Sequence, residues 1–140
     1  MSRLLTISAE EGTEADLKFL AASLRAFNRK HASRPEAQRL CFMLRDDEKT
    51  LHGGIVCEVS FDVLFIDNLC INEESRGGDY GTQLMQLAED GGRKLGARIS
   101  WLDTYSWQAR PFYEKLGYKM FGELPYSGGK YVRYFLRKDL

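Results

Sequence analysis

The apolar residues near the start of the chain predict one strand and one helix. A short, mainly apolar run predicts a strand over Leu4 to Ile7. A spacing of three and four residues then predicts a helix, because this spacing places side chains on one helical face. Thr13 and Asp16 form a plausible N-terminal capping pair for it. The apolar face of this helix consists of Leu17, Leu20, Leu24 and Phe27.

Three apolar runs follow, separated by short polar segments that are typical of turns. They cover Leu40 to Leu44, Leu51 to Val59 and Val63 to Ile71, and they predict a meander of three strands. An amphipathic helix is then predicted from Tyr80 until Gly96 ends it.

The remainder of the chain predicts a strand, a helix and two final strands. The strand covers Arg98 to Asp103, and the helix after it tolerates Pro111 in its first turn and ends at Gly117. The final strands cover Tyr118 to Phe121 and Tyr131 to Lys138, with Gly122 to Lys130 as a long irregular connection. This alternation of strands and helices predicts a mixed α/β sheet with helices on both faces.

Composition narrows the class of protein. A chain of 140 residues that is 44% hydrophobic suits one domain, residues 1–140. Twenty basic and twenty acidic residues cancel, which disfavours nucleic acid and anionic membranes as partners. No apolar run approaches the ~20 residues of a membrane helix, and no signal peptide is recognisable, so we expect a soluble protein.

Cysteine and histidine usage adds two expectations. Cys41, Cys57 and Cys70 are odd in number, far apart and all on predicted strands, so we expect buried free thiols and a cytoplasmic protein. His31 and His52 belong to no cluster with ligand spacing, so we expect no catalytic metal. The oligomeric state stays open, a homodimer included.

A candidate anion site lies where the third apolar run meets the amphipathic helix. An Arg-led, glycine-bearing turn there precedes a helix start, where unpaired backbone N–H groups and a partial positive charge favour an anion. The glycines at 77, 78 and 81 do not fit the dinucleotide pattern G-x-G-x-x-G. Gly129-Lys130 is followed by Tyr131, so it is no P-loop either.

This turn resembles the pyrophosphate loop of the GNAT superfamily of acetyl-CoA-dependent N-acetyltransferases, Arg/Gln-x-x-Gly-x-Gly/Ala. Arg76 and Gly81 fit that pattern, and Asp79 stands in place of its middle glycine. A second block, Asp103 to Tyr118, resembles the same superfamily's signature Ala-x-x-Phe-Tyr-x-x-x-Gly-aromatic. The two motifs in this order imply the GNAT fold, a mixed, mostly antiparallel twisted sheet, across essentially the whole chain.

The resemblance implies how the site would work. Acetyl-CoA is the expected acetyl donor, with Tyr113 as the acid that protonates the CoA thiolate. Asp67 lies in an apolar run that we expect to be buried, which makes it the best candidate to receive or relay the proton of the acceptor amine; Glu58 and Asp103 are runners-up. A structural role for Asp67, such as capping a bulge or a neighbouring loop, is about equally supported. The alternative interpretation of Tyr113 is that its ring only packs in the core, as most aromatic residues on such a helix do. The residues expected to contact CoA are Leu69, Cys70, Ile71, Arg76, Gly77, Gly78, Asp79, Tyr80, Gly81, Thr82, Ser106 and Gln108.

The acceptor carries no diagnostic motif. In this fold Ala26 to Glu36 and Gly122 to Lys130 would line its site, with Phe27, Tyr126 and Tyr131 framing a small amine. The basic segment Arg25 to Arg34 would repel a polybasic tail, which favours a small-molecule acceptor. The competing function is a non-catalytic acyl-CoA-binding sensor or subunit, for which Asp79 is the best argument. A scaffold that binds no CoA ranks last.

Overall fold

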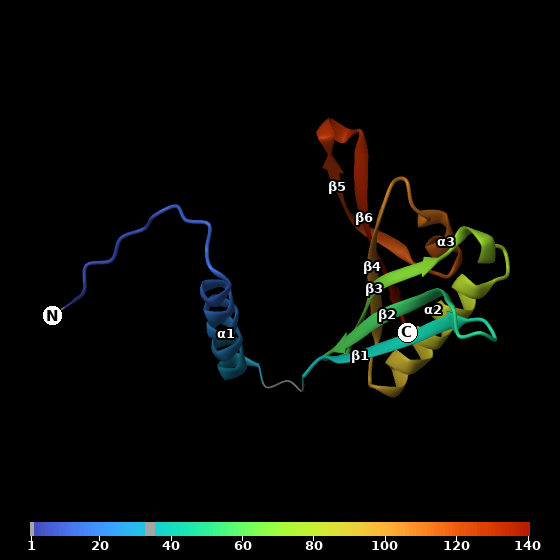
Figure 1. Cartoon of the computed structure of the whole chain (residues 1–140), viewed down its shortest axis with the longest axis horizontal. Helices are drawn as coiled ribbons and strands as arrows, with labels where there is room; N and C mark the ends of the chain where they lie inside the picture. The colour runs from blue at the N-terminus through green and yellow to red at the C-terminus, as the bar shows by residue number, and fades with distance from the viewer. Residues whose placement is uncertain (1, 33–35) are drawn as a thin grey trace. The chain divides into compact units, whose positions relative to one another are not determined.

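The computed structural model describes residues 2–32 and 36–140, which form two compact units (Figure 1). The first unit contains α1 (Glu14–His31), as the sequence predicts. The predicted capping pair is confirmed, because the Thr13 hydroxyl accepts from the Asp16 N–H at 3.1 Å and the Asp16 carboxylate accepts from the Thr13 N–H at 3.0 Å. These bonds hold the pKa of Asp16 below its usual value.

The predicted strand over Leu4 to Ile7 is wrong, since residues 2–13 form neither strand nor helix. A strand needs a neighbouring strand for its backbone hydrogen bonds, and the first unit contains none among its described residues. None of the side chains of α1 is buried.

The second unit is built on a six-stranded sheet in the order β1-β2-β3-β4-β6-β5. β1 (Gln38–Arg45), β2 (Leu51–Ser60) and β3 (Val63–Ile71) form the predicted antiparallel meander. β4 (Ile99–Tyr105) pairs parallel to β3 and antiparallel to β6 (Tyr131–Asp139). The predicted mixed, mostly antiparallel sheet is therefore confirmed.

The long irregular connection predicted over Gly122 to Lys130 is wrong. β5 (Lys119–Tyr126) continues through Gly122 and Pro125 and pairs antiparallel with β6. The ladder shifts by one residue at Phe121, so the strand continues through a bulge that interrupts its apolar alternation. The hairpin turns through Ser127, Gly128 and Gly129, all with positive φ.

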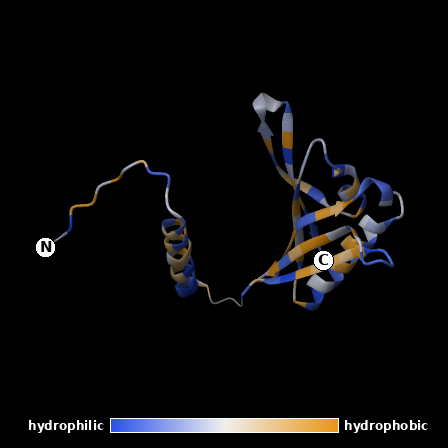
Figure 2. Cartoon of the chain, in the orientation of Figure 1, coloured by the Kyte–Doolittle hydropathy of each residue, from blue (hydrophilic) through white to orange (hydrophobic). Residues whose placement is uncertain are grey.

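The core lies between α2 (Tyr80–Lys94) and the strands β1 to β3. Fully buried side chains alternate with partly exposed ones in the second half of β2 and the first half of β3, so every second residue there faces the core. Figure 2 shows apolar residues gathered along the strands of this unit. The most deeply buried members of the core are Ile55, Cys57, Leu64, Met85, Ala88, Leu102, Tyr118 and Leu136.

A polar network within this core ties α2 to the C-terminal strands. Glu89 of α2 is 5% exposed, and its carboxylate accepts from Lys138 Nζ at 2.7 Å and from the Tyr118 hydroxyl at 3.0 Å. Tyr118 also lies 2.7 Å from the hydroxyl of Ser100 in β4. Every polar atom of this network therefore has a partner inside the fold.

Two of the three expected buried thiols are exposed. Cys57 is buried, as predicted, but Cys41 and Cys70 are exposed because they lie on the strand faces away from α2. Helices long and apolar enough to span a membrane are absent from the described part of the chain.

β3 and β4 separate soon after they pair. Their parallel register covers three pairs, from Val63 opposite Ile99 to Phe65 opposite Trp101. Beyond these pairs β3 runs on to Ile71 and β4 to Tyr105 without further register partners on each other. The splay opens a space inside the sheet, and the short helix α3 (Arg110–Lys115) follows β4 at its edge.

Candidate active site

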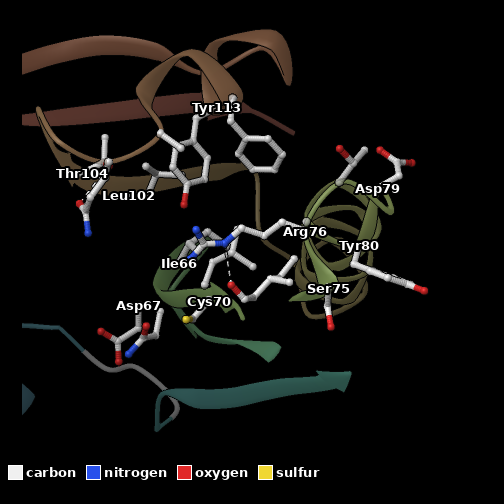
Figure 3. Close-up of a pocket in the computed structure, with 18 of the residues that line it drawn as sticks. Ile66, Asp67, Cys70, Ser75, Arg76, Asp79, Tyr80, Leu102, Thr104 and Tyr113 are labelled. Atoms are coloured by element: carbon white, nitrogen blue, oxygen red, sulfur yellow. Dashed lines mark hydrogen bonds between the residues drawn. The ribbon is translucent and has the colours of Figure 1, made fainter. Parts of the chain in front are cut away.

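A pocket of about 960 Å³ fills the space between the splayed strands. β3 forms one wall, the end of β4 and the start of α3 form the other, and the turn into α2 closes one end (Figure 3). Most of the residues that the sequence predicts for the site lie here, and the structure brings them together from four elements. The predicted residues that line the pocket are Asp67, Leu69, Cys70, Ile71, Arg76, Gly77, Asp79, Tyr80, Gly81, Thr82, Gln108 and Tyr113.

The turn into α2 leaves the helix start without a side-chain cap. Asp79 occupies the N-cap position and makes no capping hydrogen bond, so the first N–H groups of α2 have no side-chain acceptor from it. Gly77 and Asp79 both have positive φ, 88° and 65°. The open N–H groups and the helix dipole give this end of the pocket the character of an anion site.

The backbone of Asp79 explains why it can replace a glycine. A left-handed conformation is costly for most residues, and aspartate tolerates it better than most. Its backbone carbonyl also accepts the helical bond from the Gln83 N–H at 3.1 Å, so α2 starts normally. In Figure 3 Asp79 lies at the end of the pocket opposite Asp67.

Two further glycines of the turn have different surroundings. A Cβ at Gly81 would lie 3.1 Å from Cζ of Phe112, so the glycine lets the start of α2 approach α3 closely. Gly78 does not line the pocket, and a Cβ there would lie 2.7 Å from Cε2 of Tyr80. Contact between Gly78 and a ligand stays a prediction.

Arg76 lies across the middle of the pocket. Its Nε donates to the backbone carbonyl of Ile71 at 3.0 Å, the bond drawn in Figure 3. The turn before it is fixed by Asn72, whose side-chain oxygen accepts from the Ser75 N–H at 3.1 Å. The guanidinium is therefore held beside the end of β3, within the same pocket as the start of α2.

Tyr113 points its hydroxyl into the pocket from α3 (Figure 3). Burial raises the pKa of this phenol above its ordinary value near 10, so the group stays protonated at neutral pH. Its ring contacts those of Phe112 and Tyr118 at centroid distances of 5.1 and 6.2 Å. Tyr113 thus packs on the core with its ring and presents a proton donor to the pocket with its hydroxyl.

Asp67 lines the pocket but is exposed, so the expectation of a buried carboxylate is wrong. The register of β3 with β2 passes from Ile66 opposite Cys57 to Asn68 opposite Val56, which leaves Asp67 as the extra residue of a bulge. β4 has also separated from β3 at this point. Bulge and splay together expose a residue that lies within an apolar run.

Of the two residues predicted to contact CoA after β4, Gln108 lines the pocket and Ser106 does not. The Ser106 hydroxyl accepts from the Val132 N–H at 3.1 Å, and Ser106 does not line the pocket. Gln108 does, and its side-chain oxygen accepts from the Tyr105 N–H at 2.6 Å and from the Thr104 hydroxyl at 3.1 Å. Gln108 thereby fixes the turn that leads from β4 to α3.

The runner-up carboxylates are separated by the fold. Asp103 lines the pocket and is paired with Arg133, whose Nε and Nη2 both lie 3.0 Å from Oδ1. Glu58 lies on β2, outside the pocket. Of the expected acceptor segments, residues 33–35 lie outside the described residues and Phe27 belongs to the first unit, where its ring contacts His31 at 4.7 Å.

Sequence reasoning missed Trp107, Thr104 and Asn68, which also line the pocket. Trp107 is 63% exposed and stacks on Tyr105 with a centroid distance of 4.6 Å. A tryptophan between the polar residues Ser106 and Gln108, inside a recognised motif, was the signal available for it. Thr104 and Asn68 have no comparable signal, because strand residues of these types are common.

Comparison with known proteins gives concordant matches. Residues 3–118 match the acetyltransferase (GNAT) family. The chain is 26% identical over 122 residues to an acetyltransferase of Agrobacterium fabrum, covering 86% of this chain and 89% of that protein. It is 31% identical over 91 residues to blasticidin-S acetyltransferase of Streptomyces morookaense, covering 64% and 67%. A crystal structure of an acetyltransferase from Bacillus cereus superposes with a TM-score of 0.88 at 26% identity, covering 96% and 98%.

Proposed function

The chain belongs to the acetyltransferase (GNAT) family, and we propose that it transfers the acetyl group of acetyl-CoA to a primary amine of a small molecule. The observation that carries the proposal is that residues of both motifs line one and the same pocket, with an uncapped helix start at one end and the Tyr113 hydroxyl over its middle. The family match covers residues 3–118 and so includes parts of both units, which supports treating residues 1–140 as one functional domain.

The proposed donor site uses the helix start for the pyrophosphate of CoA. The N–H groups from Gly77 through Thr82 would donate hydrogen bonds to the oxygens of the two phosphates, assisted by the Arg76 guanidinium and the Thr82 hydroxyl. The thioester would lie along β3, where a backbone N–H near Leu69 to Ile71 polarises its carbonyl. β3 can offer such groups because this part of the strand has no register partner on β4.

The proposed reaction is direct attack of the amine on the thioester carbon. The N–C bond forms, the C–S bond breaks, and the electron pair of that bond leaves with sulfur. Tyr113 would give its proton to the thiolate, since a phenol kept protonated by burial is available as an acid at neutral pH. Asp67 would accept or relay the proton that the acceptor ammonium must lose.

A small-molecule acceptor has two supports. The name of the Streptomyces relative assigns it an acetylation of blasticidin-S, a small molecule. The sequence adds the basic segment Arg25 to Arg34, which would repel a polybasic tail. The sensor alternative loses part of its argument, because Asp79 adopts the left-handed backbone that the loop requires.

The test combines binding with turnover. Acetyl-CoA should raise the melting temperature, since a ligand at 100 times its Kd stabilises the native state by about 2.7 kcal/mol. Pantetheine, which lacks the pyrophosphate, is the matched control and should give a much smaller shift. A panel of primary amines is then scored by release of free CoA thiol. No shift at millimolar acetyl-CoA would refute the proposal, whereas binding without thiol release by any amine would support the sensor.

A further inference from the structure

Four aromatic rings cluster where β4 ends and the β5–β6 hairpin turns. Trp107 stacks on Tyr105 at 4.6 Å with an interplanar angle of 12°. Tyr131 meets Trp107 edge-on at 5.3 Å, and Tyr126 meets Tyr105 edge-on at 5.6 Å. Trp107 is the member of this aromatic cluster that lines the pocket.

The indole of Trp107 offers an open surface to the pocket. Tyr105 stacks on one face and Tyr131 meets the ring edge-on, yet Trp107 remains 63% exposed, so much of its surface is open. A large apolar ring left in water forfeits the stabilisation that burial would give it. A flat ligand group stacked on this surface would recover that stabilisation.

The cluster is held in place before any ligand arrives. Arg133 is paired with Asp103 at 3.0 Å, and its Nη1 donates to the Tyr126 hydroxyl at 3.5 Å. This hydrogen bond from Arg133 holds the pKa of Tyr126 below its usual range. The backbone of Tyr105 is fixed in turn by Gln108 at 2.6 Å. A preorganised platform loses little conformational freedom when a ligand binds.

Asp67 and Asp103 both line the pocket, and they differ in their ion-pair partners. Asp103 is neutralised by Arg133, whereas Asp67 makes no ion pair among the described residues. Figure 3 places Asp67 and Thr104 at the same end of the pocket, away from Asp79 and Tyr80. Asp67 and Trp107 both line this pocket, so a carboxylate without an ion-pair partner among the described residues borders the same space as the open indole.

We propose that the acceptor is a small aromatic or heteroaromatic amine. Its ring stacks on Trp107, and its amino group is directed toward Asp67, which lies on the opposite wall. This inference rests on the proposed function and names the class of acceptor for it. The reaction itself is unchanged: the amine nitrogen forms the bond to the acetyl carbon, sulfur leaves, and the ammonium proton departs before attack.

A pair of amines of equal length tests the ring subsite by kinetics. The full-length protein should acetylate 2-phenylethylamine with a kcat/KM roughly 5- to 10-fold above that for 2-cyclohexylethylamine, the scale of one aromatic stack. Trp107→Leu should bring this ratio close to one, and Trp107→Phe should retain most of it. Trp101→Phe is the control, because Trp101 stacks on Phe65 and lies outside the pocket. Equal rates for the two amines in the unchanged protein would overturn the proposal.

A binding measurement keeps the ring subsite testable without turnover. The chain has two tryptophans, so Trp107 alone reports in Trp101→Phe. 2-Phenylethylamine, added with CoA or alone, should shift its emission to shorter wavelength and saturate, because a stacked ring excludes water from the indole. The cyclohexyl amine should require several-fold higher concentrations. Absence of a saturable shift refutes the ring subsite, whereas failure of acetyl-CoA to raise the melting temperature refutes the proposed function instead.

Discussion

Two neighbouring tyrosines should separate catalysis from stability. Tyr113 and Tyr118 lie with ring centroids 6.2 Å apart, and both phenols are largely buried, but only Tyr113 lines the pocket. Replacing each by phenylalanine removes one oxygen and keeps the ring. The two substitutions are therefore matched in size and place, and they differ in what the hydroxyl contacts.

The structure sets the expected magnitudes. The Tyr113 hydroxyl makes no hydrogen bond among those of the described residues, so Tyr113→Phe should change the melting temperature by no more than about 2 °C. Its kcat should fall roughly 100-fold, the usual scale for losing one positioned acid. Tyr118→Phe removes the hydrogen-bond partner of Ser100 and one of the partners of Glu89, which keeps Lys138; the cost of about 1–3 kcal/mol lowers the melting temperature by roughly 3–10 °C.

The assay measures kcat and CoA affinity below both melting temperatures. Tyr118→Phe should keep kcat within about 3-fold of the unchanged protein, and Tyr113→Phe should keep its CoA affinity. Because burial raises the pKa of Tyr113, the rate advantage of tyrosine over phenylalanine should persist up to about pH 10. Unchanged kcat in a stable Tyr113→Phe, or equal losses of kcat in both variants, would refute the role of Tyr113 as the acid.

Four further outcomes are expected. Asp79→Gly should tighten CoA binding about 3- to 10-fold at low salt. The reason is that a carboxylate about 8 Å from a phosphate costs roughly 1 kcal/mol at an effective dielectric constant of about 40. Asp79→Asn removes the charge alone and tests whether the backbone also contributes. Asp67→Asn should lose most activity below the pKa of the amine and partly regain it at high pH. A higher KM at unchanged kcat would instead show that Asp67 binds the acceptor, and a lower melting temperature with unchanged kinetics would show a structural role. Gly77→Ala and its control Gly96→Ala both add a Cβ at positive φ with nothing within 4 Å, so both should lose about 1–2 kcal/mol of stability, but only Gly77→Ala should weaken CoA binding. Burial raises the pKa of Cys57 from about 9 to about 11, so the unfolded thiol ionises first; stability should fall as pH rises between these values, less steeply in Cys57→Ala.

The sequence predicted the elements whose signals are local. The meander, the helix from Tyr80 and the helix over Pro111 follow from apolar spacing and turn residues, and the two motifs predicted which segments meet at the pocket. What it missed depends on neighbours distant in the chain. The bulge at Phe121 hid the second half of β5, and the bulge at Asp67 together with the splay exposed a carboxylate inside an apolar run.

The exposure and contacts of individual side chains also depend on how the strands pair and on which face of the sheet α2 covers. Alternation places Cys41 and Cys70 on strands, but which face of the sheet the helix covers is a property of the assembled fold. A serine such as Ser106 can contact a ligand or cap a helix, but here its hydroxyl accepts a hydrogen bond from the Val132 N–H of β6. Trp107 became interpretable once Tyr105 was seen to cover one of its faces.

The sheet consists of two halves, here called plates, that are joined only by the short parallel ladder between β3 and β4. One plate is β1–β2–β3 and the other is β4–β6–β5, each held by long antiparallel ladders, whereas three pairs join them. Opening fluctuations concentrate where a sheet has fewest cross-links. α2 rests on the first plate, and Glu89 fastens it to the second through Lys138 and the Tyr118 hydroxyl. The two halves of the sheet on either side of the pocket are thus linked by buried contacts among residues that do not line it.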